Sequence, residues 1–470
     1  MKSETNSTNV TSFRDKVATV DKQGHRVWLF PQQPKGKLYN ARTLVSIGYV
    51  ALFFILPFLK YDGHPLFLIN IIERRFILFG QIFWPQDFFI FALGMVFFIV
   101  FIALFTVVFG RVFCGWVCPQ TIFQEMLFRR LDYWFEGDAT QQRILNKSPW
   151  NTNKILRRGG KIVVEWLISF VIANGFLCYI IGVDELGKMI REPFFQHMGE
   201  FLTLAMFTTV FFFVHSWMRE QVCTLICPFG RMQGALLDKD SIVVAYDYKR
   251  GESRGKFHKN ETRTIGDCID CGNCVRVCPT GIDIRNGTQL ECVNCTACMD
   301  ACNHMMEAVG LPRGLIRYDS ENSIANKTKH TYTWRMKAYT AVMCILLGLE
   351  VFLLSTRTDV GITVLRTPGQ LYQEQPNHKI SNLYNYKLLN KTFHDKEVVL
   401  KPENFNGTIQ LVGEEKIKIP KDGSVSGAMF IYLDSTDVTK TKTKLMIGMY
   451  ENGRKIKTFS TNFLGPYIGS

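Results

Sequence analysis

The chain has 470 residues, of which 47% are hydrophobic and 13% aromatic, and it carries a formal net charge of +14. A chain this long and this apolar is more than a single small ferredoxin, and it predicts several structural units. The excess of Lys and Arg does not predict nucleic-acid binding, because the basic residues cluster in loops between apolar runs instead of alternating with aromatic residues. That distribution is typical of a membrane protein.

The first 40 residues are polar and basic, and prolines and a glycine interrupt any long helix there. They predict a mostly irregular cytoplasmic arm. They also hold no apolar core of a cleavable signal peptide, so we expect the first membrane span to serve as the targeting signal.

Five apolar runs predict membrane-spanning helices, since a bilayer core needs about twenty apolar residues. They cover residues 44–59, 88–109, 162–182, 201–217 and 338–355. Residues 64–87 mix apolar and charged side chains and are expected to lie at the membrane interface. The long loops after the second and fourth spans are basic, whereas the loop between the third and fourth is acidic. By the positive-inside rule we expect a multi-pass protein of the bacterial inner membrane, with the basic loops cytoplasmic and the carboxyl-terminal part periplasmic.

Eight cysteines between positions 268 and 302 form the most informative stretch. They occur in two runs, each spaced Cys-x-x-Cys-x-x-Cys-x-x-x-Cys, the first starting at Cys268 and the second at Cys292. Three cysteines at intervals of three wrap one face of a 4Fe-4S cluster, and in tandem runs the fourth ligates the other cluster. The spacing therefore predicts two clusters, one held by Cys268, Cys271, Cys274 and Cys302 and one held by Cys292, Cys295, Cys298 and Cys278.

Zinc and disulfide bonds are the alternatives for these eight cysteines. Zinc sites usually pair two separated Cys-x-x-Cys knuckles and need no third cysteine at the same interval. Disulfides need an oxidising compartment, which the predicted cytoplasmic location does not provide. The two runs therefore indicate electron transfer.

Two further motifs follow the second and fourth spans, and both read Cys-x-x-x-Cys-Pro. They contain Cys114 and Cys118 in one case and Cys223 and Cys227 in the other. The proline ends or bends a helix at the second cysteine. Because both motifs follow spans of the same direction, we expect a duplicated helical pair whose motifs meet around a pseudo-twofold axis. Soft thiolates select Cu(I), zinc or iron-sulfur, and the nearby ferredoxin runs favour a redox-active metal. The alternative is that these cysteines are small buried hydrophobic residues.

Other polar or sulfur-containing side chains in the spans are weaker candidates. Three ionisable residues in or near the spans could serve proton movement or quinol binding: Glu165, His215 and Glu350. Alternatively, each lies at a helix end and reaches the membrane interface. Four methionines could assist in binding a soft metal: Met126, Met206, Met218 and Met232. Packing is the commoner role of methionine in a helix. Cys178 and Cys344 lie inside spans and are interpreted as packing residues.

The sequence after residue 356 changes character. It contains no cysteine, and it alternates in period two over residues 397–400, 408–412 and 428–432, with turn signals such as Asn-Gly and Asp-Gly between the runs. Short strands at this spacing predict a β-sandwich, for which a docking surface is the default role.

The predicted architecture is a multidomain protein with a five-span α-helical membrane bundle, an α+β ferredoxin-like insert and a carboxyl-terminal immunoglobulin-like β-sandwich. The predicted boundaries are an arm at residues 1–40, a four-helix membrane domain at 41–237, a double 4Fe-4S domain at 238–335, a fifth helix at 336–356 and a periplasmic β domain at 357–470.

These motifs in combination resemble the CcoG family, also called FixG or RdxA, the cytochrome c oxidase accessory proteins. The stretches 74–80, 83–87, 238–241 and 250–252 are also similar to that family. The resemblance implies a cupric reductase that converts Cu(II) to Cu(I) during assembly of a cbb-type oxidase. It places transient copper at Cys114, Cys118, Cys223 and Cys227, and it implies contact with membrane lipid and with the oxidase or its copper chaperones and transporters.

Two other classes of function remain open. The Cys-x-x-x-Cys-Pro motif is shared with NapH and NosR, so a quinol-linked electron conduit without copper chemistry is one alternative. A membrane scaffold stabilised by its clusters is another. No nucleotide-binding glycine loop is present, so the electron donor is a protein or a quinol. The sequence leaves the oligomeric state open, a dimer included.

Overall fold

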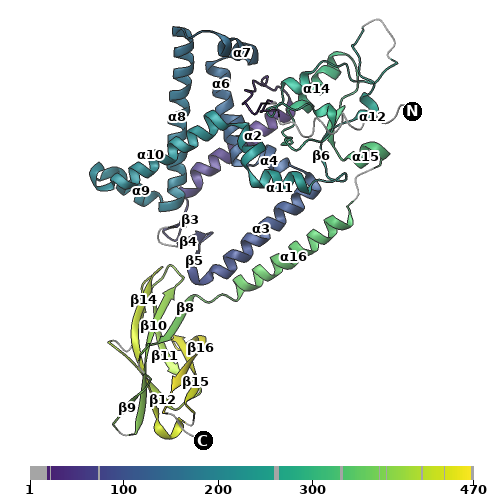
Figure 1. Cartoon of the computed structure of the whole chain (residues 1–470). Coiled ribbons are helices and arrows are strands. Elements are labelled where there is room, and N and C mark those ends of the chain that lie inside the picture. The colour runs from purple at the N-terminus through teal and green to yellow at the C-terminus, as the bar shows by residue number, and fades with distance from the viewer. Residues whose placement is uncertain are drawn as a thin grey trace. The chain divides into compact units, whose positions relative to one another are not determined.

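The computed structural model describes residues 18–21, 23–71, 75–258, 264–328, 332–369, 371–376, 378–413, 416–438 and 440–466 (Figure 1). The chain forms two compact units. Unit 1 contains Met1–Ile55, Met95–Cys178 and Asp184–Leu347, and unit 2 contains Leu56–Gly94, Tyr179–Val183 and Gly348–Ser470.

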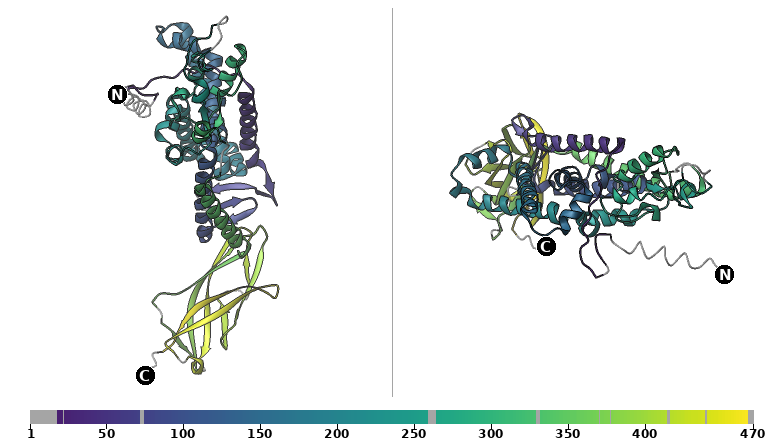
Figure 2. Two further views of the ribbon diagram at one scale, coloured as in Figure 1. Left: turned by 90° about the vertical axis from the view of Figure 1, so that its right-hand side faces the viewer. Right: turned by 90° about the horizontal axis from the view of Figure 1, so that it is seen from above.

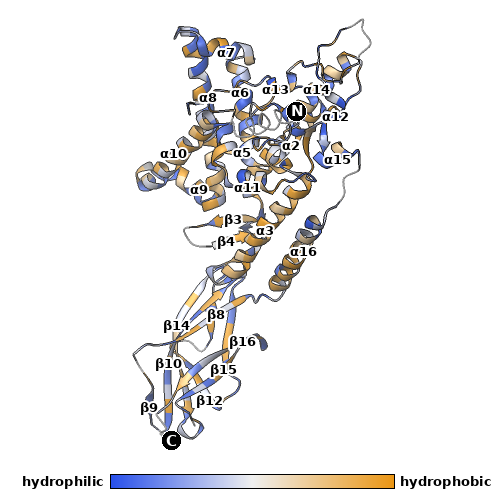
Figure 3. Cartoon of the chain, turned by 45° about the vertical axis from the view of Figure 1, so that its right-hand side comes forward, coloured by the Kyte–Doolittle hydropathy of each residue, from blue (hydrophilic) through white to orange (hydrophobic). Residues whose placement is uncertain are grey.

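Five helices are long and apolar enough to cross a membrane, which confirms the predicted five spans. Their main elements are α2 (Lys37–Ile55), α3 (Phe88–Phe109), α8 (Thr152–Ile181), α10 (Met198–Phe213) and α16 (Trp334–Ser355). The first span continues to Phe58, and the fourth runs from Phe195 to Met218, which includes the short helical turns on either side of α10. Figure 3 shows α3 apolar along nearly its whole length, whereas the first turns of α8 are polar. At 30 residues α8 is about 45 Å long, which exceeds the apolar core of a bilayer. Its polar first turns therefore extend beyond the span that the sequence predicted.

The start of α2 differs from the predicted arm for a physical reason. Most of that arm, residues 1–17 and 22, lies outside the described residues, and residues 23–35 are irregular as expected. The helix begins at Lys37 because the carboxylate of Asp300 accepts hydrogen bonds from the backbone amides of Leu38 and Tyr39, at 3.3 and 2.8 Å. A carboxylate at a helix amino terminus is a stabilising cap.

Shorter helices complete unit 1. They are α4 (Val112–Trp116), α5 (Pro119–Thr121), η3 (Ile122–Phe128), α6 (Arg129–Phe135), α7 (Ala139–Lys147), α9 (Val183–Arg191), η4 (Phe194–His197), η5 (Val214–Met218), η6 (Val222–Ile226), α11 (Pro228–Leu236) and α12 (Tyr248–Gly251). The ferredoxin region adds α13 (Asn273–Arg276), η7 (Ile284–Asn286), α14 (Ala297–Ala308), α15 (Glu321–Asn326) and an antiparallel pair of strands, β6 (Val243–Tyr246) and β7 (Ile316–Asp319).

In unit 2 the segment predicted at the interface forms small antiparallel sheets. The strands are β1 (Lys60–Tyr61), β2 (His64–Pro65), β3 (Phe67–Asn70), β4 (Arg75–Leu78) and β5 (Gln81–Phe83), with η1 (Leu56–Phe58) before them and η2 (Pro85–Asp87) after them. Asp87 is buried and pairs with Arg357 at 2.7 Å and with Lys391 at 2.5 Å. Removing one partner of such a buried pair costs about 3–5 kcal/mol, so this cluster fixes the end of β5 to the β domain.

The rest of unit 2 is a β-sandwich (Figure 2), which confirms the predicted immunoglobulin-like fold. One sheet has the order β12-β14-β10-β8 with β9 on β10, and the other has β13-β11-β15-β16. The strands are β8 (Val360–Arg366), β9 (Gln373–Gln375), β10 (Lys379–Asn390), β11 (Lys396–Pro402), β12 (Gly407–Leu411), β13 (Ile417–Ile419), β14 (Ser424–Asp434), β15 (Lys442–Glu451) and β16 (Arg454–Leu464), with η8 (Ser435–Asp437) after β14. Alternate side chains from both sheets, such as Ile431 and Ile447, form the core.

Candidate iron-sulfur and thiol sites

The two cysteine runs of the ferredoxin region have the same backbone conformation. In the first run Asp270 and Gly272 are left-handed, with φ of 52° and 68°. In the second run Asn294 and Thr296 take the same places, with φ of 53° and 66°. A left-handed residue on each side of the second cysteine coils the chain tightly, and a helix begins right after it. The sequence repeat is therefore also a structural repeat.

The folded chain brings the eight cysteines of the two runs close together. Cys268, Cys271, Cys274 and Cys302 line one small cavity together. Burial, together with the other three members of this set, raises the pKa of the Cys302 thiol to about 12. Burial likewise raises the pKa of Cys298 well above its usual value, with contributions from Cys295, Cys292, Cys278 and Cys274. The first predicted set therefore shares one cavity, the second lies among its own members and Cys274, and the assignment of ligands to each cluster stays a prediction.

These donor sets fit iron-sulfur clusters chemically. Among the described residues, no three Cys, His, Asp or Glu side chains converge on a point where one metal ion could be held. A cluster spreads its thiolates over separate iron atoms, so each set can be wider than the ligand set of a single ion. Four soft thiolates around one apolar cavity are the donors that iron-sulfur clusters require.

The two Cys-x-x-x-Cys-Pro motifs also share one local structure. Cys114 lies in α4 and Cys223 in η6, whereas Cys118 and Cys227 have non-helical backbone with ψ of 126° and 112°. In each motif the proline then takes the first position of the next helix. The proline therefore ends the first helical turn as expected, because it disfavours helical backbone in the residue before it.

The four cysteines of these motifs lie close enough to influence one another's ionisation. Burial is the main cause that raises the pKa of Cys223 to about 12, and Cys118, Cys114 and Cys227 contribute to this increase. The thiol of Cys114 donates a 2.7 Å hydrogen bond to Oε1 of Gln233, which lies in α11 just beyond the second motif. The two motifs therefore meet in one thiol cluster, the group formed by Cys114, Cys118, Cys223 and Cys227.

Arg111 is a buried cation beside the thiol cluster, and only 2% of it is exposed. Burial raises the pKa of Cys114, and the charge and hydrogen bond of Arg111 oppose that increase. The guanidinium also donates to the carbonyl oxygen of Leu290 and lies 2.9 Å from the position of a Cβ added to Gly230. Arg111 thus supplies positive charge to a site made of thiols.

Gly115 packs the thiol cluster directly onto the second cysteine run. A Cβ added at Gly115 would lie 2.5 Å from the carbonyl oxygen of Val293 and 2.8 Å from that of Asn294. Both residues lie between Cys292 and Cys295. The carbonyl oxygen of Gly115 accepts a 2.7 Å hydrogen bond from Nε of Arg42 in α2. Glycine is therefore required here by a backbone-to-backbone approach.

The weaker candidates are placed as follows. Glu165 and His215 are buried in the bundle of unit 1, where Glu165 accepts a 2.7 Å hydrogen bond from Ser216. Glu350 lies in unit 2, 3.4 Å from a Cβ added at Gly94. Cys178 is buried and Cys344 exposed, each in a different spanning helix. Of the four methionines, Met126 is buried and Met206 is 63% exposed, while Met218 and Met232 are half-buried.

Sequence reasoning missed Arg111, Gly115 and Asp300. Gly115 had a visible signal, because a glycine inside a cysteine motif indicates close backbone approach. The sequence contains no comparable signal for Arg111 or Asp300. A single arginine before a cysteine, or a single aspartate in a helix, is common on any protein surface.

Comparison with known proteins agrees with this arrangement. Residues 218–321 match a family of 4Fe-4S dicluster domains, residues 91–138 match a 4Fe-4S binding domain, and residues 351–466 match a family described as the IG-like fold at the C-terminal of FixG. Together with the five spans, these matches define a membrane-bound iron-sulfur protein of the electron-transfer class.

Curated relatives narrow the class to one family. Protein RdxA of Cereibacter sphaeroides is 32% identical over 450 residues, covering 91% of this chain and 94% of RdxA. The nitrogen fixation protein FixG of Rhizobium meliloti is 35% identical over 62% of this chain and 56% of FixG. The chain belongs to the FixG/RdxA family. It is also related to the ferredoxin-type protein NapH of Escherichia coli, which is 28% identical over 41% of this chain and 59% of NapH.

Proposed function

We propose that this protein reduces Cu(II) to Cu(I) at the thiol cluster, with electrons from its iron-sulfur clusters, to supply copper for assembly of a cbb-type oxidase. The observation that carries the proposal is the contact of Gly115 with Val293 and Asn294. This contact packs one Cys-x-x-x-Cys turn against the cysteine run that would hold a cluster, so the electron path between the two is short and formed by protein atoms.

The residues of the thiol cluster suit copper as a substrate. When bound, the iron-sulfur clusters supply electrons one at a time. Reduction of Cu(II) to Cu(I) takes one electron, and soft thiolates hold the product ion in preference to harder cations. Two thiolates on one Cu(I) leave a net charge of −1, which the buried guanidinium of Arg111 offsets.

Each thiol that binds copper must lose its proton. The raised pKa of Cys223 means that this thiol is protonated at neutral pH before the metal arrives. Copper binding therefore releases protons, and affinity should increase with pH below the thiol pKa values.

The proposed location follows from the distribution of charge in the sequence. The ferredoxin region and the thiol cluster face the cytoplasm of the inner membrane, and the β-sandwich faces the periplasm. A reporter fused after Ser470 should behave as extracytoplasmic and one fused near Lys256 as cytoplasmic. Equal behaviour of both reporters would rule out this orientation.

A variant without the thiol cluster tests the copper proposal. Cys114, Cys118, Cys223 and Cys227 are replaced together by Ala, and the matched control replaces Cys178 and Cys344. The fourfold variant should keep the iron content of the parent, and it should lose Cu(I) binding and Cu(I) formation by chemically reduced protein. The control should keep all three properties. Copper reduction at the parent's rate in the fourfold variant would contradict the proposal and favour an electron conduit of the NapH type.

A second candidate for the same residues is an additional iron-sulfur cluster. The 4Fe-4S family match at residues 91–138 favours it, because that stretch contains Cys114 and Cys118 and none of the eight ferredoxin cysteines. The fourfold variant distinguishes the two candidates, since loss of iron together with copper reduction would assign the four thiols to a cluster.

A further inference from the structure

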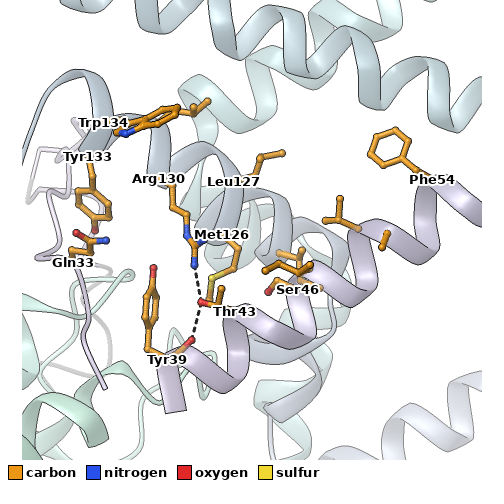
Figure 4. Close-up of a pocket in the computed structure, with 15 residues that line it drawn as sticks. Gln33, Tyr39, Thr43, Ser46, Phe54, Met126, Leu127, Arg130, Tyr133 and Trp134 are labelled. Atoms are coloured by element: carbon orange, nitrogen blue, oxygen red, sulfur yellow. Dashed lines mark hydrogen bonds between the residues drawn. The ribbon is translucent and has the colours of Figure 1, made fainter. Parts of the chain in front are cut away.

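A cavity of about 940 Å³ lies between α2 and the helical segment formed by η3 and α6 (Figure 4). Its α2 wall includes Tyr39, Thr43, Ser46, Val50 and Phe54, which recur at helical spacing and share one face. Because α2 is a predicted span, the cavity runs from the first turn of the helix into its apolar part. A volume of this size is typical of sites for small organic ligands.

One end of the cavity is polar. Figure 4 shows Tyr39, Arg130, Tyr133 and Gln33 gathered at this end, whereas Phe54 lies at the other. Nη2 of Arg130 donates a 2.7 Å hydrogen bond to Oγ1 of Thr43, and its guanidinium lies 5.8 Å from the centre of the Tyr39 ring. Flat aromatic rings around a fixed donor suit a flat ring with oxygen acceptors.

The two neighbouring arginines of α6 differ in their partners. Arg129 is buried between Glu125 and Glu220, at 3.0 and 3.1 Å. No carboxylate pairs with Arg130 within the part of the chain that the structure describes, and the hydroxyl of Tyr39 makes no hydrogen bond there. The cavity therefore offers two donors with unused capacity to bind acceptor atoms of a ligand.

The polar end also adjoins the second set of cluster cysteines. The backbone amide of Tyr39 donates to Asp300, two residues after Cys298 in α14. One turn further along α2, Arg42 donates a hydrogen bond to the carbonyl oxygen of Gly115. Burial raises the pKa of Cys295, and the positive charge of Arg42 counteracts this increase. A ligand at the polar end therefore lies about one turn of α2 from Arg42, whose charge acts on Cys295.

We propose that this cavity binds a membrane quinol and that the quinol is the electron donor of the protein. This inference rests on the electron path of the proposed function. The quinol ring lies at the polar end with Arg130 and Tyr39 donating hydrogen bonds to its oxygens, and its prenyl tail follows Val50 and Phe54. Oxidation to the quinone releases two electrons, one for each of two iron-sulfur clusters, and two protons that pass to solvent beside the 85% exposed Trp134.

The test compares cavity variants with matched surface variants of the full chain in lipid nanodiscs under anaerobic conditions. The cavity variants are Tyr39→Phe and Arg130→Met, and the controls are the exposed Tyr248→Phe and Arg157→Met. A short-chain naphthoquinol is added, and the bleaching of the cluster absorbance is followed. Arg130→Met should raise the quinol concentration for half-maximal rate by about tenfold or more, since a hydrogen bond from a charged donor is lost. The controls should match the parent.

Binding is measured independently of electron transfer with a photoreactive azidoquinone. The label should attach to peptides from α2 or α6, and excess naphthoquinone should prevent it. If phospholipid prevents the labelling and naphthoquinone does not, the cavity is a lipid site and the proposal is overturned. Equal bleaching rates in both cavity variants and the parent would also overturn it.

The same preparations separate this inference from the proposed function. Chemically reduced cavity variants should form Cu(I) at the parent's rate, because they keep the thiol cluster. Failure of the chemically reduced parent to form Cu(I), with quinol bleaching intact, would contradict the copper proposal and leave the quinol site standing.

Discussion

The two groups of cysteines in unit 1 are built in different ways. The ferredoxin cysteines lie on coils with repeated left-handed residues, and one set of four lines a cavity of its own. The thiol cluster lies where two helical turns end at prolines, beside the buried cation Arg111. A repeated coil around a cavity suits a resident cofactor, whereas thiols with a balancing charge suit an ion that enters and leaves. The predictions below test this distinction, from the largest expected effect to the smallest.

Loss of a cluster ligand should give the largest effect. Cys302→Ser and Cys278→Ser should each remove about half of the iron, because each cysteine completes a different set of four. Iron per chain in anaerobically purified protein is the measurement.

Double variants show whether the sets are assigned correctly. Cys302→Ser combined with Cys268→Ser should lose no more iron than Cys302→Ser alone, whereas Cys302→Ser combined with Cys292→Ser should lose nearly all of it. The reverse pattern would mean that each run holds its own cluster.

Gly115→Ala should separate the thiol cluster from the second cysteine run. The added Cβ would lie 2.5 Å from the carbonyl oxygen of Val293, so one backbone must move. Displacements of about 1 Å can cost on the order of a hundredfold in rate, and we expect Cu(I) formation by reduced protein to slow by at least about tenfold. The control is Gly159→Ala, where an added Cβ meets nothing within 4 Å. Unchanged electron transfer in Gly115→Ala would show that the electrons take another path.

Arg111→Met should weaken copper binding in a pH-dependent way. Arg111 opposes the increase in the pKa of Cys114, so its loss lets that pKa rise further. Protons then compete better with Cu(I), and the curve of Cu(I) affinity against pH should shift to higher pH.

The matched control for Arg111→Met is Arg231→Met, which removes an exposed arginine that lines the same cavity beside Cys223. This variant should shift the curve much less, because solvent screens an exposed charge. Equal shifts for the two variants would show that the pKa values of the thiols depend on the net charge around the site and not on the buried contact with Arg111.

Sequence patterns predicted the parts of this protein that depend on local order. The helix α3 has the predicted limits because no charge interrupts residues 88–109. The strands β11, β12 and β14 overlap the runs of period two. The spacing of the cysteines predicted that both groups of thiols are sites, and their ligands remain predictions until the variants are measured.

Contacts between distant residues account for what the sequence did not predict. The start of α2 depends on Asp300, more than 260 positions away. The cluster of Asp87, Arg357 and Lys391 joins three separate segments of unit 2, and no single segment indicates it. Local periodicity carries no information about such pairs, because each partner alone looks like an ordinary surface charge.

The smallest effect is expected at Gly272, where the two cysteine runs differ in residue type but not in conformation. Gly272 and Thr296 occupy equivalent left-handed positions, with φ of 68° and 66°. A Cβ added at Gly272 meets nothing within 4 Å, so Gly272→Ala changes the conformational energy without a clash. The cost of a left-handed alanine is about 1–2 kcal/mol.

Gly272→Ala should therefore keep its full iron content and lose that iron several-fold faster to a chelator than the parent does. The matched variant Thr296→Gly relieves the same strain in the second run, but it also removes the hydrogen bond from the threonine hydroxyl to the carbonyl oxygen of Cys295. The relieved strain, about 1–2 kcal/mol, and the lost hydrogen bond, about 0.5–1.5 kcal/mol, act in opposite directions, so iron release should change little. Loss of iron already during purification of Gly272→Ala would mean that the first run tolerates no strain, and that the two coils are less alike than their backbones indicate.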